Sequence, residues 1–295
     1  MFHHNQFDLH IYSQKFLRHL KRQKYSDETI SGYAKDLKKF NEFIFTSYEG
    51  RVFTEELQKE DILDYLTYLD EQGLKSSSIA RNLSTLKSFY KFLVYEMDFK
   101  IDVAARIKHP KVHSQLPNVL DFEEVQRLLQ AAKEYSEFYH VFFSLIYYTG
   151  SRITPIRVLP KEDIDLKNKK LYLSKTKNGH DLYLPLNEKL CELLEFFLAK
   201  NEHDQSTFVF RSPRSIHQPV SASDARKNLK KIVQLAGIEK RVTPHTLRHC
   251  TATHLTLRGV DQKYIASILG HRDLRSTARY QQLKVEDLRE CVDKL

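Results

Sequence analysis

The stretch from Thr243 to Tyr280 brings together side chains that could act on a phosphate ester. It contains two imidazoles, His245 and His271, a guanidinium, Arg248, and the phenol of Tyr280. A guanidinium presents a planar fork that matches two phosphate oxygens, and a phenol can act as a nucleophile when a neighbouring group takes its proton. This set is suited to holding a phosphodiester and attacking it with a tyrosine.

Local signals predict a helix that begins inside this stretch. Thr243 is a good N-cap and Pro244 suits the first helical position, and the apolar pattern continues to a plausible stop at Gly259. His245 and Arg248 are then three residues apart on one face of the first turn. The N-terminus of a helix attracts phosphate through its unpaired N–H groups and its dipole.

Two further short helices are expected downstream. The first starts near Asp261 and ends at Gly270, so that His271 lies on the bend that follows a glycine C-cap. The second covers residues 273–283 and carries Tyr280. Each of these motifs is weak by itself, because short matches of this kind arise often by composition. Their joint order and spacing carry the argument.

An arginine upstream could belong to the same site. Arg152 follows an apolar run, Val141–Tyr148, that predicts a buried helix ending at Gly150. Such a helix would present Arg152 just past its end. Taken alone, an arginine after a C-cap is more often an ordinary surface residue.

A lysine pair lies in a predicted β-hairpin. The Asn-Gly pair at 178–179 separates two apolar segments, 171–173 and 182–185, which is a strong hairpin signal. Lys177 would then lie at the tip, able to reach a neighbouring groove, with Lys175 close by. Lysines are also frequent near turns simply because turns are exposed to water.

In this order the residues resemble the active site of the tyrosine recombinases, the phage integrase family that includes the Xer proteins. The six matching positions are Arg152, Lys177, His245, Arg248, His271 and Tyr280. Lys177 is preferred to Lys175 because it lies eight residues before Pro185, as the family's lysine lies before its hairpin proline.

The chain departs from the family pattern close to Arg152. Where the family usually has an acidic residue, this chain has Thr154-Pro155-Ile156, and Ser151 replaces a larger apolar residue. Proline lacks the N–H that continues a helix and biases Thr154 away from helical angles. We therefore expect a local difference in the backbone that supports Arg152.

The resemblance implies how the reaction begins. Tyr280 would attack a DNA phosphodiester and form a 3′-phosphotyrosyl link with release of a 5′-hydroxyl. His245 would position the tyrosine or accept its proton, and Lys177 would be the acid for the departing oxygen. A phenol with a pKa of about 10 needs such help at neutral pH.

The remaining residues would stabilise the transition state. Arg152 and Arg248 would hold the non-bridging oxygens, and His271 would add a hydrogen bond. Because one ester replaces another, no nucleotide cofactor is needed, and we find no acidic cluster for a metal. The family implies double-stranded DNA with an inverted-repeat core as partner, and strand exchange through a Holliday junction by four protomers, either identical or paired with a paralogue.

The expected fold is mainly α with a small antiparallel β-sheet. Residues 1–103 resemble the family's helical core-binding (SAM-like) domain, 104–118 a linker, and 119–295 the catalytic domain. Four helices are expected in the first domain, the second capped by Ser26 and the fourth by serines at 76–78.

Basic residues of the first domain permit two interpretations. Arg81, Lys87 and Lys91 lie opposite the apolar stripe of the fourth helix. Basic residues opposite an apolar stripe more often form a solvated face, although the family resemblance favours a contact with DNA. The last segment, 284–295, is amphipathic; in this family such a tail docks on the neighbouring protomer, and packing on its own protomer is the alternative.

Composition fits a chain that binds an anionic partner. The net charge is +9 and the sequence pI about 9.2, and residues 119–295 carry most of the positive surplus. Three scattered cysteines suggest no disulfide framework, which predicts a reducing cytoplasm. No signal peptide or membrane-spanning run is found.

Three function classes remain open from the sequence. The first is a site-specific recombinase that resolves replicon dimers, as Xer proteins do, or that integrates and excises a mobile element. The second is a type IB topoisomerase, against which the order of domains argues. The third is a non-catalytic DNA-binding protein, against which the six filled polar positions argue.

Overall fold

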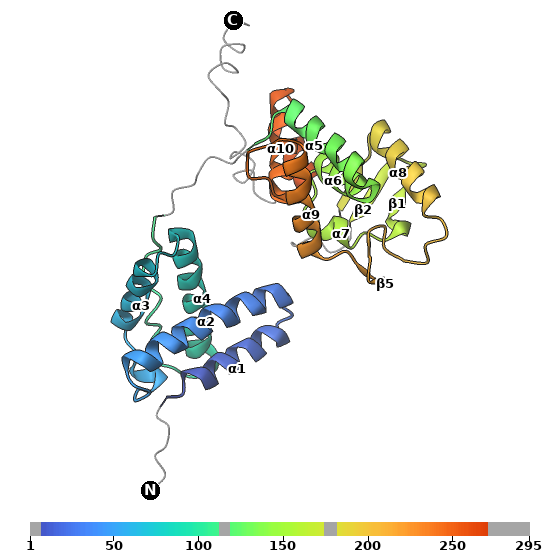
Figure 1. Ribbon diagram of the computed structural model, residues 1–295. Helices are drawn as coiled ribbons and strands as arrows, with labels where there is room; N and C mark the ends of the chain where they lie inside the picture. The colour runs from blue at the N-terminus through green and yellow to red at the C-terminus, as the bar shows by residue number, and fades with distance from the viewer. Residues whose placement is uncertain (1–6, 112–118, 174–181, 271–295) are drawn as a thin grey trace, which may run out of the picture. The chain divides into compact units, whose positions relative to one another are not determined.

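The chain divides into two compact units, Met1–Gln115 and Leu116–Leu295, which we call the N-terminal and C-terminal units (Figure 1). The computed structural model describes residues 7–111, 119–173 and 182–270. Each unit has its own hydrophobic core. Within the described ranges no helix is both long and apolar enough to cross a membrane.

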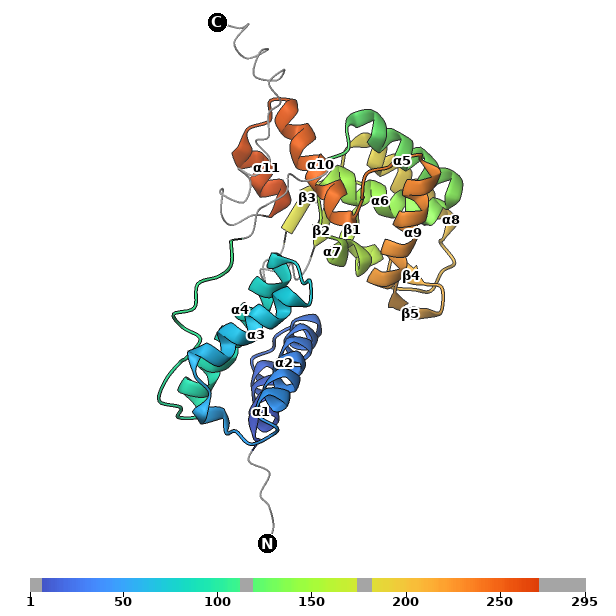
Figure 2. The same cartoon turned by 60° about the vertical axis from the view of Figure 1, so that its left-hand side comes forward.

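The N-terminal unit consists of helices. They are α1 (Leu9–Arg22), α2 (Asp27–Ser47), the short 3₁₀ helix η1 (Thr54–Glu56), α3 (Lys59–Glu71) and α4 (Ser76–Glu96). Figure 2 shows α1 lying along α2 and α3 lying along α4. Both α1 and α3 pack on the pair formed by α2 and α4. The core between them is rich in aromatic rings, among them Phe16, Phe40, Tyr65, Phe89 and Tyr90.

Capping signals predicted one of these helix starts correctly and another incorrectly. The Ser26 side chain accepts a hydrogen bond from the Thr29 amide at 3.3 Å, which confirms it as the N-cap of α2. In α4 the N-cap is Lys75, and Ser76 is already the first helical residue. The serine cap predicted there is therefore wrong, because three consecutive serines do not mark which residue leaves the helical angles.

Two basic side chains of α4 are already engaged within the N-terminal unit. Arg81 forms an ion pair with Asp36, which is 2% exposed and also accepts a hydrogen bond from the Thr85 hydroxyl. The Lys87 ammonium donates to the Ala105 carbonyl at 3.1 Å. These contacts join α4 to α2 and to the segment that follows α4, so neither side chain is simply part of a solvated face.

Helices also dominate the C-terminal unit, in which α6 (Glu137–Thr149) is the central element. The others are α5 (Phe122–Tyr135), α7 (Ile153–Arg157), α8 (Glu188–Lys200), α9 (Ala222–Leu235), α10 (Pro244–Leu257) and α11 (Gln262–Leu269), with a 3₁₀ helix, η2 (Lys161–Asp163). Helices α5, α7, α8, α9 and α10 all contact α6. This position explains its composition, since it buries side chains on nearly every side, including Val141, Phe142, Phe143, Leu145 and Ile146.

Two small antiparallel sheets complete the C-terminal unit. Strands β1 (Ile164–Asp165), β2 (Lys170–Leu173) and β3 (Leu182–Pro185) form one sheet in that order, and β4 (Arg211–Ser212) pairs with β5 (Ser215–Pro219). The prediction of a mainly α fold with a small antiparallel sheet is confirmed. Phe208 makes an isolated bridge to Pro160, and the β4–β5 pairing begins only at Arg211.

A capping box starts α5, and it yields a stability prediction. Asp121 Oδ1 accepts from the Glu124 amide at 2.7 Å, and Glu124 Oε2 accepts from the Asp121 amide at 2.9 Å. Asp121→Ala should lower the free energy of unfolding by about 1 kcal/mol, because the Glu124 amide loses its acceptor. Asp121→Asn keeps an acceptor and should stay close to wild type. Urea unfolding of the three proteins measures this; equal midpoints for Asp121→Ala and wild type would contradict it.

Candidate active site

The predicted start of α10 is confirmed, and it places His245 and Arg248 in different surroundings. Pro244 is the first helical residue, and the Thr243 hydroxyl accepts from the Thr246 amide at 3.2 Å. His245 is exposed in the first turn, whereas Arg248 is only 5% exposed. Of this pair, Arg248 is therefore the residue that belongs to the interior.

Arg248 joins the ends of two helices that are far apart in sequence. Its Nη1 donates to the Gly150 carbonyl at 2.7 Å, and its Nη2 donates to the Leu269 carbonyl at 2.6 Å. Gly150 is the C-cap of α6, and Leu269 is the last residue of α11. One guanidinium therefore holds three helices, α6, α10 and α11, at a single point.

The physical chemistry of helix ends explains why this buried cation is tolerated. The last carbonyls of a helix have no partner within the helix and carry the negative end of its dipole. A buried charge is costly unless it is hydrogen-bonded, and hydrogen bonds from a charged donor are stronger than neutral ones. Arg248 donates to carbonyls at two such helix ends. The hydrogen bonds therefore offset the cost of burying the guanidinium, and they also satisfy carbonyls that would otherwise lack a partner.

Gly150 permits the close approach of the three helices. It has a left-handed φ of 63°, which ends α6 as the sequence predicted. A Cβ atom built on Gly150 would lie 2.8 Å from Cδ2 of Leu269 and 3.3 Å from Cγ2 of Thr251. Both the backbone angle and the space therefore favour glycine here.

Arg152 follows directly from this junction. Its backbone is extended, with φ −71° and ψ 156°, and it is the N-cap of α7; its side chain is partly exposed. The preceding Ser151 is buried, and its hydroxyl accepts a 2.9 Å hydrogen bond from the Thr149 hydroxyl. Serine is accommodated at this buried position because it has a polar partner.

Pro155 does not disturb the backbone in the expected way. The helix α7 runs from Ile153 to Arg157 and includes both Thr154 and Pro155. The proline is the third helical residue, where a backbone N–H has no partner within the helix, so no hydrogen bond is lost. The expected departure of Thr154 from helical angles is therefore wrong, because the position of the proline in the first turn removes its main cost.

Two more polar side chains of α10 bind the last turn of α6. Thr251 Oγ1 donates to the Tyr147 carbonyl at 2.5 Å. The Tyr147 hydroxyl and His254 Nδ1 are 2.9 Å apart, and His254 Nε2 lies 2.9 Å from the Leu120 carbonyl. Because a carbonyl only accepts, Nε2 carries the hydrogen, and neutral His254 accepts from Tyr147 through Nδ1.

His254 is thus a buried link between α6, α10 and the segment before α5. It is 4% exposed and stacks on the Phe122 ring at 3.9 Å between centroids, and the Arg258 guanidinium lies 4.7 Å from the same ring. Burial, more than any charge, lowers the pKa of His254. The sequence analysis missed this residue. The available signal was the recurrence of polar residues at helical spacing along α10, namely Arg248, Thr251 and His254.

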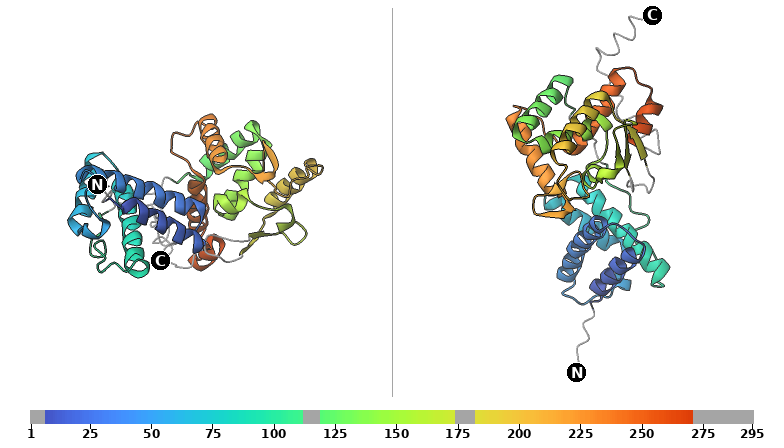
Figure 3. Two further views of the ribbon diagram at one scale, coloured as in Figure 1. Left: turned by 90° about the horizontal axis from the view of Figure 1, so that it is seen from below. Right: turned by 90° about the vertical axis from the view of Figure 1, so that its right-hand side faces the viewer.

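The base of the predicted hairpin lies beside the end of α11. Leu173 and Leu182 are direct partners in the β2–β3 pairing, and a Cβ atom on Gly270 would lie 3.4 Å from Cδ2 of Leu182. Figures 2 and 3 show β3 close to α11 in two orientations. Lys175 and Lys177 themselves lie in 174–181, outside the described residues.

His271 and Tyr280, with the tail from 284, also lie outside the described residues. The residues that the structure brings to the junction are therefore Arg248 and the backbone next to Arg152, with His245 in the same first turn of α10. His249, which follows Arg248, is half-buried. Its pKa is lowered by burial first, and then by the charges of His245 and Arg248.

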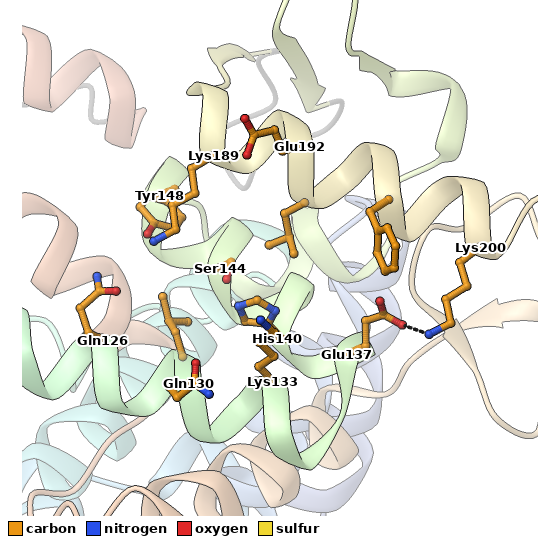
Figure 4. Close-up of a pocket in the computed structure, with 13 residues that line it drawn as sticks. Gln126, Gln130, Lys133, Glu137, His140, Ser144, Tyr148, Lys189, Glu192 and Lys200 are labelled. Carbon is orange, nitrogen blue, oxygen red and sulfur yellow. Dashed lines mark hydrogen bonds and ion pairs between the residues drawn. The ribbon is translucent and has the colours of Figure 1, made fainter.

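An open groove elsewhere in the C-terminal unit contains none of the six predicted residues. It lies between α5, α6 and α8, has a volume of about 810 Å³, and has Ser144 and His140 at its centre (Figure 4). Burial, followed by the charges of Lys133 and Lys189, lowers the pKa of His140. The groove therefore does not belong to the candidate site.

Sequence profiles of known families match both units. The phage integrase family matches residues 118–287, and the phage integrase N-terminal SAM-like domain matches residues 14–97. A tyrosine recombinase XerD of Halalkalibacterium halodurans is 32% identical over 94% of both chains, and a tyrosine recombinase of Pseudothermotoga lettingae is 29% identical over 95% of both.

Solved structures of the same class share the fold. A XerA recombinase, 25% identical, superposes with a TM-score of 0.56 and covers 97% of this chain and 98% of its own. A XerH recombinase bound to a palindromic difH substrate, 18% identical, has a TM-score of 0.79 and covers 98% and 96%. A lambda integrase tetramer on a Holliday junction, also 18% identical, has a TM-score of 0.74 and covers 94% and 80%.

The helical N-terminal unit and the C-terminal unit built around α6 and α10 have the fold of these recombinases, and the family match places the chain in a class of DNA strand-transferring enzymes. The chain belongs to the phage integrase family of tyrosine recombinases. It acts in site-specific DNA recombination through a covalent intermediate, and within the family it is Xer-like.

A pair of glycine substitutions tests the close packing at the junction. Gly259 has a left-handed φ of 77° like that of Gly150, but a Cβ there would meet nothing within 4 Å. Gly259→Ala should cost about 1 kcal/mol of unfolding free energy from the backbone angle alone. Gly150→Ala should cost a further 1–3 kcal/mol or so, because its Cβ collides with Leu269. Urea unfolding of both variants provides the comparison; equal losses would show that the space around Gly150 is not limiting.

The buried histidines predict a dependence of stability on pH. Folding lowers the pKa values of His140, His249 and His254, so the unfolded chain binds more protons just below its own histidine pKa of about 6.5. The contribution of these three histidines to the free energy of unfolding is fully present above that pH and decreases as the pH falls below it. The urea concentration at the unfolding midpoint should therefore decrease when the pH is lowered from about 7 to about 5.

The contribution of His254 to this slope can be isolated. His254→Gln keeps an N–H donor for the Leu120 carbonyl but cannot titrate, so it should be less stable at pH 7 and should lose less stability on acidification. His203→Gln, at an exposed position, should keep the wild-type slope. Identical slopes for His254→Gln and wild type would contradict the assignment of a neutral buried imidazole.

Proposed function

We propose that one active site on the C-terminal unit performs the strand transfer. Its residues are Arg152, Lys177, His245, Arg248, His271 and Tyr280. The single observation that carries the proposal is the pair of hydrogen bonds from Arg248 to the Gly150 and Leu269 carbonyls. These bonds bring together two chain segments that each continue, after two residues, into a proposed site residue.

The covalent chain limits how far those residues lie from the junction. Arg152 is two residues beyond Gly150, and His271 is two residues beyond Leu269. Since neighbouring Cα atoms are about 3.8 Å apart, each Cα is at most about 7.6 Å from the Cα of its anchor. A phosphate placed at the junction would therefore be within reach of both side chains and of His245 on the first turn of α10.

The neighbouring strands support Lys177 as a member of the site. The chain leaves β2 at Leu173 and returns to β3 at Leu182, which lies against Gly270. The segment that carries Lys177 therefore starts and ends next to the last turn of α11. We assign the general-acid role to Lys177 rather than Lys175 on the family spacing to Pro185.

The proposed reaction exchanges one phosphate ester for another. The Tyr280 oxygen attacks phosphorus, its proton passes toward His245, and the bond from phosphorus to the 5′ oxygen breaks as Lys177 protonates that oxygen. Arg152 and Arg248 offset the charge that grows on the non-bridging oxygens, and His271 donates a further hydrogen bond. A 5′-hydroxyl of another strand then reverses the steps and releases Tyr280.

The proposed substrate is double-stranded DNA with an inverted-repeat core, bound by four protomers during strand exchange. A lambda integrase dimer is described as bound to a core site, and a lambda integrase tetramer as bound to a Holliday junction, which supports this assembly. We propose Xer-like dimer resolution or the movement of a mobile element as the biological role. Cys191 and Cys250 are buried free thiols, in keeping with a cytoplasmic enzyme.

Capture of covalent DNA adducts tests the proposed nucleophile. Wild type and Tyr280→Phe are incubated with fragmented genomic DNA and denatured, and the DNA that stays attached is sequenced. Adducts should form with wild type, share an inverted-repeat core, and fall at least a hundredfold with Tyr280→Phe. Equal adduct yields from both proteins would overturn Tyr280, and adducts with no shared sequence would favour topoisomerase-like relaxation.

A further inference from the structure

One face of the N-terminal unit carries a row of exposed basic side chains, which we call the basic face. It lines a groove of about 630 Å³ between α1 and the end of α4. The rim consists of cationic side chains of α1, and the remaining lining residues are apolar side chains of α4 and its C-cap. The rim residues are Lys15, Arg18, Lys21 and Arg22, and the apolar residues are Phe92 and Met97.

In the described part of the N-terminal unit, no aspartate or glutamate forms an ion pair with the four cationic side chains of the basic face; Glu96, at the end of α4, lies 3.7 Å from His19 of α1 instead. The helix α1 contains no aspartate or glutamate. Within the described ranges, none of these four lysine and arginine side chains forms an ion pair, and the Lys15 ammonium lies over the Tyr12 ring, 5.0 Å from its centroid. The face therefore keeps its positive charge for a partner outside the unit.

The segment formed by η1 and α3 carries the opposite charge, and we call it the acidic face. Residues 54–71 include seven carboxylates and one lysine, Lys59. The carboxylates are Glu55, Glu56, Glu60, Asp61, Asp64, Asp70 and Glu71. None of them forms an ion pair with a lysine or arginine in the described part of the chain. Glu56 and Asp61 accept hydrogen bonds from nearby backbone amides. The other five carboxylates do not cap a helix in this way.

Stabilisation of the helices themselves does not explain these charges. A carboxylate near a helix N-terminus and a cation near its C-terminus interact favourably with the dipole. Asp70 and Glu71, however, lie in the last turn of α3, where the dipole opposes negative charge. Lys15 and Arg18 lie in the middle of α1, where the dipole has little effect.

The two faces lie on separate helices, α1 and α3, which each pack on the pair formed by α2 and α4 (Figure 2). Opposite charges on two different patches of one molecule favour a head-to-tail contact. In such a contact the basic face of one copy meets the acidic face of the next copy. Contacts of this kind close into a ring when the rotation between copies permits it.

Apolar side chains add a second match between the faces. On α3, Leu63 and Tyr68 are 38% and 40% exposed, and they lie at helical spacing among Glu60, Asp64 and Glu71. The basic face has the inverse arrangement, with cations around an apolar floor formed by the partly exposed Met97 and by Phe92, which is 5% exposed. A phosphate backbone would leave that apolar floor unused, so the lining favours a protein partner over DNA.

We propose that the basic face of one protomer docks on the acidic face of a second copy of this chain, head to tail, when protomers assemble on DNA. The inference deepens the proposed assembly on DNA. It does not require the proposed active site, because both faces lie entirely in the N-terminal unit.

Zero-length cross-linking tests this contact in the full-length chain. A carbodiimide joins a lysine amine to a carboxylate only when the two groups are in contact. Equal amounts of ¹⁴N- and ¹⁵N-labelled Tyr280→Phe protein, bound to sheared genomic DNA, are cross-linked and analysed by mass spectrometry. Isotopically mixed peptides should join Lys15 or Lys21 to carboxylates of residues 60–71. The Tyr280→Phe background removes strand cleavage, so the result is independent of the test of the nucleophile.

Charge reversal sharpens the test. One variant changes Lys15, Arg18, Lys21 and Arg22 to glutamate, and a second changes Glu60, Asp64, Asp70 and Glu71 to lysine, leaving the locally bonded Glu56 and Asp61 intact. Each variant alone should lose at least fivefold in cross-linked dimer. An equimolar mixture should recover it, because the acidified α1 of one variant then faces the basic α3 of the other.

Two outcomes would overturn the proposal. The first is the absence of mixed-isotope peptides between the two faces in DNA-bound protein. The second is weaker DNA binding by the α1 variant with no recovery on mixing, which would assign the basic face to DNA. A control that changes the exposed Lys227, Lys230 and Lys231 of α9 to glutamate should leave the yield of these cross-links unchanged.

Discussion

The buried Arg248 guanidinium, held between two helix C-termini, is the interaction on which the C-terminal unit depends. It satisfies carbonyl groups at Gly150 and Leu269 that the helices α6 and α11 leave without partners. It also compensates its own burial through charge-assisted hydrogen bonds. Because the chain continues from each of those carbonyls toward Arg152 and His271, the same interaction that stabilises the packing also defines the location of the proposed chemistry.

The other contacts of α10 act on the same turn of α6. Thr251 and His254 bind the backbone and side chain of Tyr147, and Gly150 provides the space that lets Leu269 approach. The position of Arg152 is therefore determined by groups on another helix, about a hundred residues away in the sequence. A residue that grips phosphate must be held in place to act in the transition state, and this network supplies that support.

The two units contribute differently to an enzyme that acts on DNA. The C-terminal unit carries the proposed chemistry, whereas the N-terminal unit separates its charges onto different faces of one helical bundle. Arg81, which the pattern on α4 suggested for a solvated or DNA-binding face, is instead paired with the buried Asp36. The basic side chains of α1 have no such partner in the described part of the unit, which makes them the stronger candidates for a contact between molecules.

The amino-acid sequence by itself determined the features that depend on near neighbours. The N-cap Thr243, the glycine ends of α6 and α11 and the paired strands β2 and β3 were predictable, because each rests on residues a few positions apart. The order of polar residues also indicated the family. Only the tertiary structure decided that Arg248 joins two helix ends, that His254 links Tyr147 to Leu120, and that Pro155 fits in a helix. The first two are contacts between residues 21 to 134 positions apart in the chain, and the third depends on where α7 begins, which packing against the core decides. No local pattern encodes such geometry.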